Sequence, residues 1–240
     1  MALAAVTLDA AGTLFEPAEP VGVTYARAAA RHGIIVTPDE VARGFAAALA
    51  GAPPLAFPGA GPADLPARER AWWYAVVRAA LGVRAPADAL EGCFDELFAH
   101  YARPDAWRVF ADVVPALTAL RGLRLAVVSN FDGRLPALLA GLGLAPFLDA
   151  VVYSSSVAAA KPEPAIFHAA LRKLDVPAAE ALHVGDGVIA DTQGARAAGM
   201  RAVLLDRSRR RPPVPPDVRV IDSLAELARS PVWFSRVGQP

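Results

Sequence analysis

The chain has 240 residues, enough for one large domain or for a domain that carries an insertion. Its 24 basic residues balance its 24 acidic ones, so no net field favours nucleic acid or an anionic membrane as a partner. Cys93 is the only cysteine, which excludes an internal disulfide and favours a cytoplasmic protein. We also expect no signal peptide and no membrane span, because apolar runs are short; oligomeric state stays open.

A short buried strand is predicted at the start of the chain. An apolar run begins near Ala2 and ends on Asp9, and Gly12 then allows a sharp turn. In open α/β sheets ligands collect at the carboxyl ends of the strands, so Asp9 is placed for chemistry on a bound group. The alternative is an Asx turn in which Asp9 bonds only its own backbone.

Four helices with no strand between them are predicted next. The second is marked by Thr37 as N-cap, Pro38 at the first helical position and acidic residues in the first turn. A stretch rich in Gly and Pro, residues 51–66, is predicted as a loop. The four helices are expected over residues 21–32, 38–50, 67–81 and 86–101.

Beyond residue 106, predicted helices and strands alternate, which is typical of a parallel sheet. The helices are expected over 113–121, 134–142, 164–174 and 191–198, and the strands over 123–129, 150–153, 181–184, 202–205 and near Val218. We therefore predict an α/β fold: a Rossmann-like doubly wound core, residues 1–16 and 107–240, with a helical cap, residues 17–106, inserted after the first strand. The Arg- and Pro-rich stretch 207–216 is predicted as a solvated loop, with an anion site as the alternative.

Polar residues follow the strands that this core would place beside Asp9. Each has an ordinary alternative as a turn residue or a solvated loop residue. Together, an acid, a hydroxyl, a cation and a second pair of acids at one sheet edge fit the transfer of a phosphoryl group to a carboxylate. The residues concerned are Ser129, Asn130, Lys161, Asp186 and Asp191.

Phosphoryl transfer explains why these residue types are needed together. A phosphate ester is an anion, so a carboxylate can approach it only when a divalent cation and a fixed ammonium offset the repulsion. Asp9 would attack, Mg²⁺ held by Asp9 and Asp186 would bridge to the phosphoryl oxygens, and Lys161 with the Ser129 hydroxyl would bind the remaining ones. Water would then hydrolyse the aspartyl phosphate, while the cap excluded bulk water and selected the leaving group.

Four motifs, in this order, resemble those of the haloacid dehalogenase-like hydrolases that carry a helical cap after the first motif. They are Asp-Ala-Ala-Gly-Thr-Leu from Asp9, Val-Ser-Asn from Val128, Lys161-Pro162, and Gly-Asp-Gly-Val-Ile-Ala-Asp from Gly185. The resemblance covers about residues 3–205. It implies that Asp9 is the nucleophile and a magnesium ligand, that the Ala11 backbone carbonyl and Asp186 are further ligands, and that Asp191 is a ligand or a neighbour of one. The implied phosphate binders are Ser129, Asn130 and Lys161, and the implied substrate is a small phosphorylated molecule.

The chain departs from this family pattern at Ala11, where phosphatases of the family carry an aspartate that acts as general acid and base. Such a group contributes ~10² to 10⁴ in rate, so we expect a weak or specialised phosphatase. The alternative is a catalytically impaired, phosphatase-like binding protein. Trp72 and Trp73 would then form a partner anchor if both rings were exposed.

Two other activities occur among relatives that lack this acid. Phosphonoacetaldehyde hydrolases need a cap lysine for a Schiff base, and no lysine precedes Lys161, so this activity is excluded. The 2-haloacid dehalogenases resemble the segment from Asp9 to Thr13, but they lack the acidic pair Asp186 and Asp191. Dehalogenation is therefore the less favoured hydrolytic activity.

Overall fold

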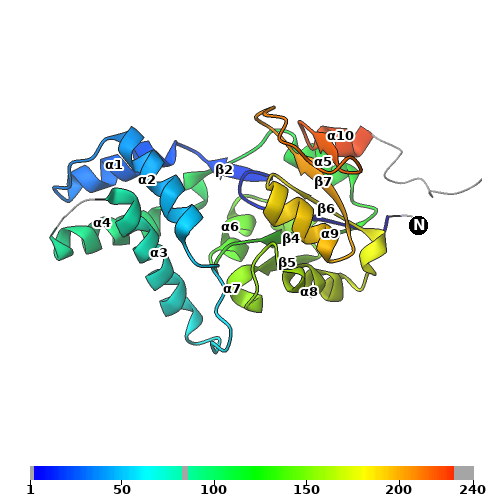
Figure 1. Cartoon of the computed structure of the whole chain (residues 1–240), viewed down its shortest axis with the longest axis horizontal. Coiled ribbons are helices and arrows are strands. Elements are labelled where there is room, and N and C mark those ends of the chain that lie inside the picture. Colours follow the sequence, from blue (N-terminus) through cyan, green and yellow to red (C-terminus); the bar gives the residue numbers. More distant parts are fainter. Residues whose placement is uncertain (1–2, 83–85, 230–240) are drawn as a thin grey trace, which may run out of the picture.

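Figure 1 shows the computed structural model, which describes residues 3–82 and 86–229. Six parallel strands form its main sheet in the order β5-β4-β1-β6-β7-β8. The chain moves outward from β1 in one direction, returns to β6 and continues in the other, which confirms the predicted doubly wound α/β fold. The strands are β1 (Ala5–Leu8), β4 (Arg124–Ser129), β5 (Ala150–Tyr153), β6 (Ala181–Gly185), β7 (Arg201–Leu205) and β8 (Arg219–Ile221).

Helices cover both faces of this sheet. Because side chains alternate along a strand, Val127 packs into one apolar cluster and Val128 into the other. Burial on both faces explains why the strands are continuous apolar runs. The first face is covered by α5 (Val113–Ala119), α6 (Leu135–Gly141) and α10 (Ala225–Arg229), the second by α8 (Pro164–Leu174) and α9 (Gly194–Ala197).

Four consecutive helices, which we call the four-helix insertion (residues 21–100), lie beside the sheet (Figure 1). They surround their own apolar cluster, which includes Tyr25, Val77 and Phe94. At the predicted start of the second helix, Thr37 and Glu40 form a capping box. The helices are α1 (Val21–Arg31), α2 (Pro38–Gly51), α3 (Leu65–Leu81) and α4 (Ala87–His100).

Two short antiparallel strands, which the sequence analysis did not predict, lie where the chain enters and leaves the four-helix insertion. They are β2 (Phe15–Pro17) and β3 (Trp107–Val109). Three residues are too few to show a period in sequence, so only their pairing reveals them. The expected boundaries at residues 16 and 107 both fall on this pair. The division into core and cap domains stays a prediction, and residues 230–240 of the expected core lie outside the described residues.

The prediction of a helix over 191–198 is wrong in its start and its geometry. The structure has a π-helix (Val188–Gln193) that leads into α9. The backbone N–H groups of Asp191 and Thr192 both donate to the Gly187 carbonyl, each at 3.1 Å. This wide turn places Asp191 one turn inside the helical segment. A further short helix, α7 (Ser154–Val157), was also not predicted.

The loop 207–216 has no helix or strand, as predicted, but its first arginine is not solvated. Half-buried Arg207 donates to Asp112 at 3.0 Å and to the Thr13 carbonyl at 2.7 Å. Its guanidinium also lies 3.9 Å from the centre of the Phe110 ring. Arg207 therefore supports the turn that follows Asp9.

None of the helices in the described part of the chain combines the length and the hydropathy that a membrane span requires.

Candidate active site

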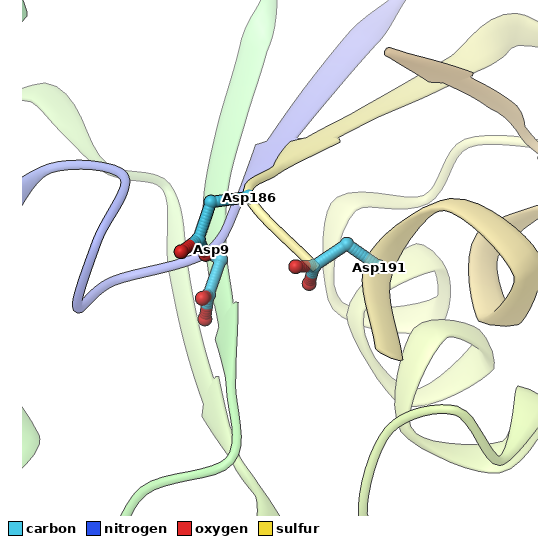
Figure 2. Close-up of side chains that lie close together, drawn as sticks. All are labelled: Asp9, Asp186 and Asp191. Carbon is cyan, nitrogen blue, oxygen red and sulfur yellow. The ribbon is translucent and has the colours of Figure 1, made fainter. Parts of the chain in front are cut away.

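Three carboxylates meet at the carboxyl edge of the sheet. Asp9 follows β1 and Asp186 follows β6; these strands pair in parallel with Leu8 opposite Val184, so both end at the same level. Asp191 comes from the π-helix that follows. One carboxylate oxygen from each residue lies within 4.8 Å of the others. Figure 2 shows the three side chains gathered where β1 and β6 end.

Lys161 is buried between two of these acids. Its Nζ lies 2.7 Å from Oδ1 of Asp9 and 2.5 Å from Oδ1 of Asp191. Burial alone would lower the pKa of Lys161, but the charges of Asp191 and Asp9 outweigh burial and raise it. For Asp191, burial would raise the pKa, and the Lys161 charge together with the His183 hydrogen bond lowers it instead. The ammonium and the Asp191 carboxylate therefore stay charged at neutral pH.

The other two predicted phosphate binders come from the end of β4, beside β1. Ser129 is buried there. Asn130 is engaged with the backbone of Lys161: its Nδ2 donates to the Lys161 carbonyl at 2.9 Å, and its Oδ1 accepts from the Lys161 N–H at 2.7 Å. Asn130 therefore fixes the position of Lys161 beside Asp9.

His183 belongs to this cluster, although the sequence analysis did not single it out. It is buried on β6, with Nε2 3.1 Å from Oδ1 of Asp191 and Nδ1 2.8 Å from Oγ1 of Thr7. A carboxylate can only accept, so Nε2 carries a proton, and in the neutral imidazole Nδ1 then accepts from the hydroxyl. The histidine thus orients Asp191. The signal in the sequence was a histidine inside an otherwise apolar strand, next to a site acid.

The turn after Asp9 lies directly against Asp186. Gly12 has φ +85°, and a Cβ built on it would lie 2.4 Å from Oδ2 of Asp186. Only glycine allows both this backbone conformation and this approach. Half-buried Ala11 lies on the same turn, two residues beyond Asp9.

The cluster carries more negative than positive charge. With all acids ionised, three carboxylates and one ammonium leave a net charge of two negatives. Asp186 is the most exposed of the three acids. Its pKa is nevertheless raised to about 7, first by partial desolvation of the carboxylate and then by the negative charges of Asp9 and Asp191. Although Lys161 lies 2.7 Å from Oδ1 of Asp9, this buried oxygen has no partner with hydrogen-bond geometry among residues 3–82 and 86–229. A carboxylate oxygen that lacks a hydrogen-bond partner and lies near other carboxylate oxygens is a suitable ligand for Mg²⁺.

A cavity of about 200 Å³ lies between the four-helix insertion and Ala11. Trp73 lines it and donates its indole N–H to Oδ2 of Asp132 at 2.5 Å. Half-buried Trp72 donates to the Pro53 carbonyl at 2.8 Å. Both rings are half-buried, so they do not form the pair of exposed rings that would favour the binding-protein alternative.

Polar contacts also hold the four-helix insertion to the loops at the sheet edge. Buried Glu69 on α3 accepts from the Gly133 N–H at 3.0 Å and from the Ser155 hydroxyl. Arg134 bonds Asp132 through two nitrogens and donates a further hydrogen bond to the Phe98 carbonyl at 3.2 Å. These contacts join the helices to the loops that follow β4 and β5.

Known proteins match the chain over most of its length. A family model described as haloacid dehalogenase-like hydrolase matches residues 3–199. Human haloacid dehalogenase-like hydrolase domain-containing protein 3 is 35% identical over 92% of this chain and 91% of its own length. A phosphoserine phosphatase from Thermus thermophilus is 36% identical over 65% of this chain and 62% of its own length.

Solved structures match the fold as well. A phosphatase of the same family from Thermococcus onnurineus has a TM-score of 0.66 and 25% identity, covering 98% of this chain and all of that chain. A 2-haloacid dehalogenase from Pseudomonas syringae pv. Tomato has a TM-score of 0.62 and 25% identity, covering 94% of this chain and 96% of its own. Overall similarity therefore does not separate the two activities, and the residues at the sheet edge must do so.

Proposed function

The chain belongs to the haloacid dehalogenase-like hydrolase family, and we propose that it is a Mg²⁺-dependent phosphatase of small phosphorylated molecules that uses Asp9 as nucleophile. The observation that carries this proposal is the cluster of Asp9, Asp186 and Asp191 around the Lys161 ammonium. A nucleophile that attacks carbon needs no surplus of carboxylates. A net charge of two negatives on the cluster with all acids ionised, the nucleophile included, instead favours a divalent cation and an anionic substrate.

The metal would be held by Asp9, Asp186 and the Ala11 carbonyl, with Asp191 as a ligand or a neighbour of one. Bound Mg²⁺ would neutralise charge on the phosphoryl oxygens. The hydrogen bonds that Asp191 already accepts from Lys161, His183 and the Gly187 N–H favour the neighbouring role. In that role Asp191 would hold the ammonium rather than the metal.

The reaction would proceed in two steps at Asp9. A carboxylate oxygen of Asp9 attacks phosphorus, the bond from phosphorus to the leaving oxygen breaks, and the leaving group departs with the electron pair. Lys161, held by Asn130, and the Ser129 hydroxyl bind the phosphoryl oxygens as charge shifts during the transfer. Water then attacks the aspartyl phosphate and releases inorganic phosphate and the free carboxylate.

Ala11 provides no proton for the leaving oxygen. We therefore expect the enzyme to hydrolyse aryl and acyl phosphates, whose leaving groups depart as stable anions, faster than alkyl phosphates. The test is phosphate release from 4-nitrophenyl phosphate and acetyl phosphate, with and without MgCl₂. Activity should require Mg²⁺ and be absent in Asp9→Asn.

Two other outcomes would replace this proposal. If the protein bound Mg²⁺ but hydrolysed no phosphate, we would regard it as a phosphatase-like binding protein. Chloride release from 2-chloropropionate without metal would instead assign it to the dehalogenases. The cytoplasmic location, and the absence of nucleic-acid and membrane partners, remain predictions from composition and are not needed for this test.

A further inference from the structure

We propose that the cavity between the four-helix insertion and Ala11 binds an uncharged aromatic leaving group, so that the substrates are phosphate monoesters of phenols. This inference rests on the proposed function, because it names the group that leaves when Asp9 attacks. Its starting observation is the chemical character of the wall next to the reacting carboxylate.

The wall of the cavity is made almost entirely of carbon. The helices contribute aromatic rings and aliphatic chains, among them Phe45, Leu49 and Phe94. The indole N–H of Trp73 is bonded to Asp132 and that of Trp107 to the Tyr101 carbonyl. A sugar or amino-acid leaving group would lose its hydrogen bonds to water on entry and find few in return.

Among the described residues that line the wall, Arg134 alone is charged, and its charge is already matched. Two of its nitrogens donate to buried Asp132, and a third donates to the Phe98 carbonyl. Its guanidinium carbon lies 4.1 Å from the centre of the Phe98 ring. The pairing with Asp132 leaves no uncompensated charge for a second charged group on the esterified alcohol, and the guanidinium is itself packed among aromatic rings of the wall.

Ala11 links this wall to the chemistry. It lines the cavity and lies two residues beyond Asp9 on the same turn. Its methyl group extends the apolar surface at the position where the family's phosphatases carry the acid. A phenol is the alcohol that satisfies both conditions, because its ring is apolar and its oxygen leaves as an anion without a proton donor.

The size of the cavity limits the ligand to about one ring. Engineered apolar cavities of ~150 Å³ bind benzene, so about 200 Å³ admits a ring with a short alkyl chain. A series of 4-alkylphenyl phosphates, from hydrogen to propyl, tests this limit. The leaving phenols are almost equally acidic. Any trend in kcat/KM along the series therefore reflects binding in the cavity and not the chemical step.

We expect kcat/KM to rise by up to ~4-fold per added methylene and then to stop rising once the cavity is full. Acetyl phosphate, whose leaving group is too small and polar to use the cavity, serves as the internal reference. Calorimetry with 4-propylphenol, without Mg²⁺ or phosphate, measures binding to the cavity independently of catalysis. Glycerol is the polar control ligand in the same measurement.

Leu49→Glu places a charge at the partly exposed rim of the cavity, and Ala47→Glu places the same charge on an exposed position of the same helix. Leu49→Glu should weaken the binding of 4-propylphenol by at least about fivefold. It should lower kcat/KM for 4-propylphenyl phosphate by the same factor. Acetyl phosphate turnover should stay within about twofold of the parent in Ala47→Glu, and in Leu49→Glu the ratio of kcat/KM for 4-propylphenyl phosphate to kcat/KM for acetyl phosphate should fall by at least about fivefold. Val21→Glu, at another cavity position, repeats the test if Leu49→Glu fails to fold.

The outcomes separate the two proposals. Turnover of acetyl phosphate with no binding of 4-propylphenol, or equal effects of the two glutamates, overturns the inference and leaves the phosphatase standing. No turnover of any phosphate overturns the proposed function and the substrate class with it, even if 4-propylphenol binds. A rise along the alkyl series that Leu49→Glu removes and Ala47→Glu keeps supports both.

Discussion

At the scale of single residues, Ala11 is where this chain differs most from a conventional phosphatase of its family. Ala11→Asp should raise turnover of an alkyl phosphate such as glycerol phosphate by ~10² to 10⁴, equivalent to ~3 to 5 kcal/mol of barrier. The new carboxylic acid would protonate the leaving oxygen from the turn beside Asp9. The gain should be much smaller for 4-nitrophenyl phosphate, whose leaving group needs no proton.

Ala11→Asn is the matched control, since it has the same size and cannot supply the proton. A carboxylate near Asp9 adds like-charge repulsion, so Ala11→Asp should also lose some stability unless Mg²⁺ is bound. If the variant folds and binds Mg²⁺ but hydrolyses glycerol phosphate no faster than the parent, alanine is not the cause of slow turnover. The cavity or the remaining site would then limit the reaction.

At the scale of elements, Glu69 connects α3 to the loops at the sheet edge. Glu69→Ala would leave the Gly133 N–H and the buried Ser155 hydroxyl without their partner, at a cost of ~1 to 3 kcal/mol for the buried hydroxyl. We expect a lower denaturant midpoint and faster proteolysis between the helices and the sheet. Glu91→Ala, on an exposed position of α4, is the control. Equal midpoints for the two variants would show that the contact adds nothing to stability.

At the scale of the whole molecule, metal binding and pH should act together on stability through Asp186. The pKa of this acid rises from 3.8 to about 7 in the metal-free fold, so the folded chain holds the proton more tightly than the unfolded one. The contribution of Asp186 to stability is therefore greatest below its ordinary pKa and is lost as pH rises from about 4 to 7. Mg²⁺ competes with that proton. One pH unit below 7, the apparent affinity of the chain for Mg²⁺ should therefore be about tenfold lower than at a pH where Asp186 is fully ionised.

We therefore expect MgCl₂ to raise the melting temperature more at pH 8 than at pH 6. At a concentration of 100 times the Kd, the stabilisation is ~2.7 kcal/mol. NaCl of equal ionic strength controls for screening, and Asp186→Asn should remove both the shift and its pH dependence. A magnesium shift of the same size at both pH values would contradict the assignment of Asp186 as the titrating ligand.

The sequence alone was sufficient for the family, for the α/β class and for most elements. Continuous apolar runs, the period of 3.6 residues and the capping signals at Thr37 are local, so most strands and helices are visible without their neighbours. The same local logic placed acids at the ends of strands and a lysine just before the helix that begins at Pro164. It failed for β2 and β3, which exist only because they pair with each other, and for the π-helix, whose width is tied to the contacts of Asp191 with Gly187.

Only the tertiary structure decided how the polar residues relate to one another. Asn130 lies 31 positions before Lys161 and Thr7 lies 176 positions before His183, and no pattern in sequence reports such pairs. The apolar cavity likewise joins Ala11 to residues from all four inserted helices and to Arg134. Residue types and strand ends were readable because they depend on the chain near each position. Packing between distant segments decides which side chains contact each other. It also decides which residues surround the leaving group.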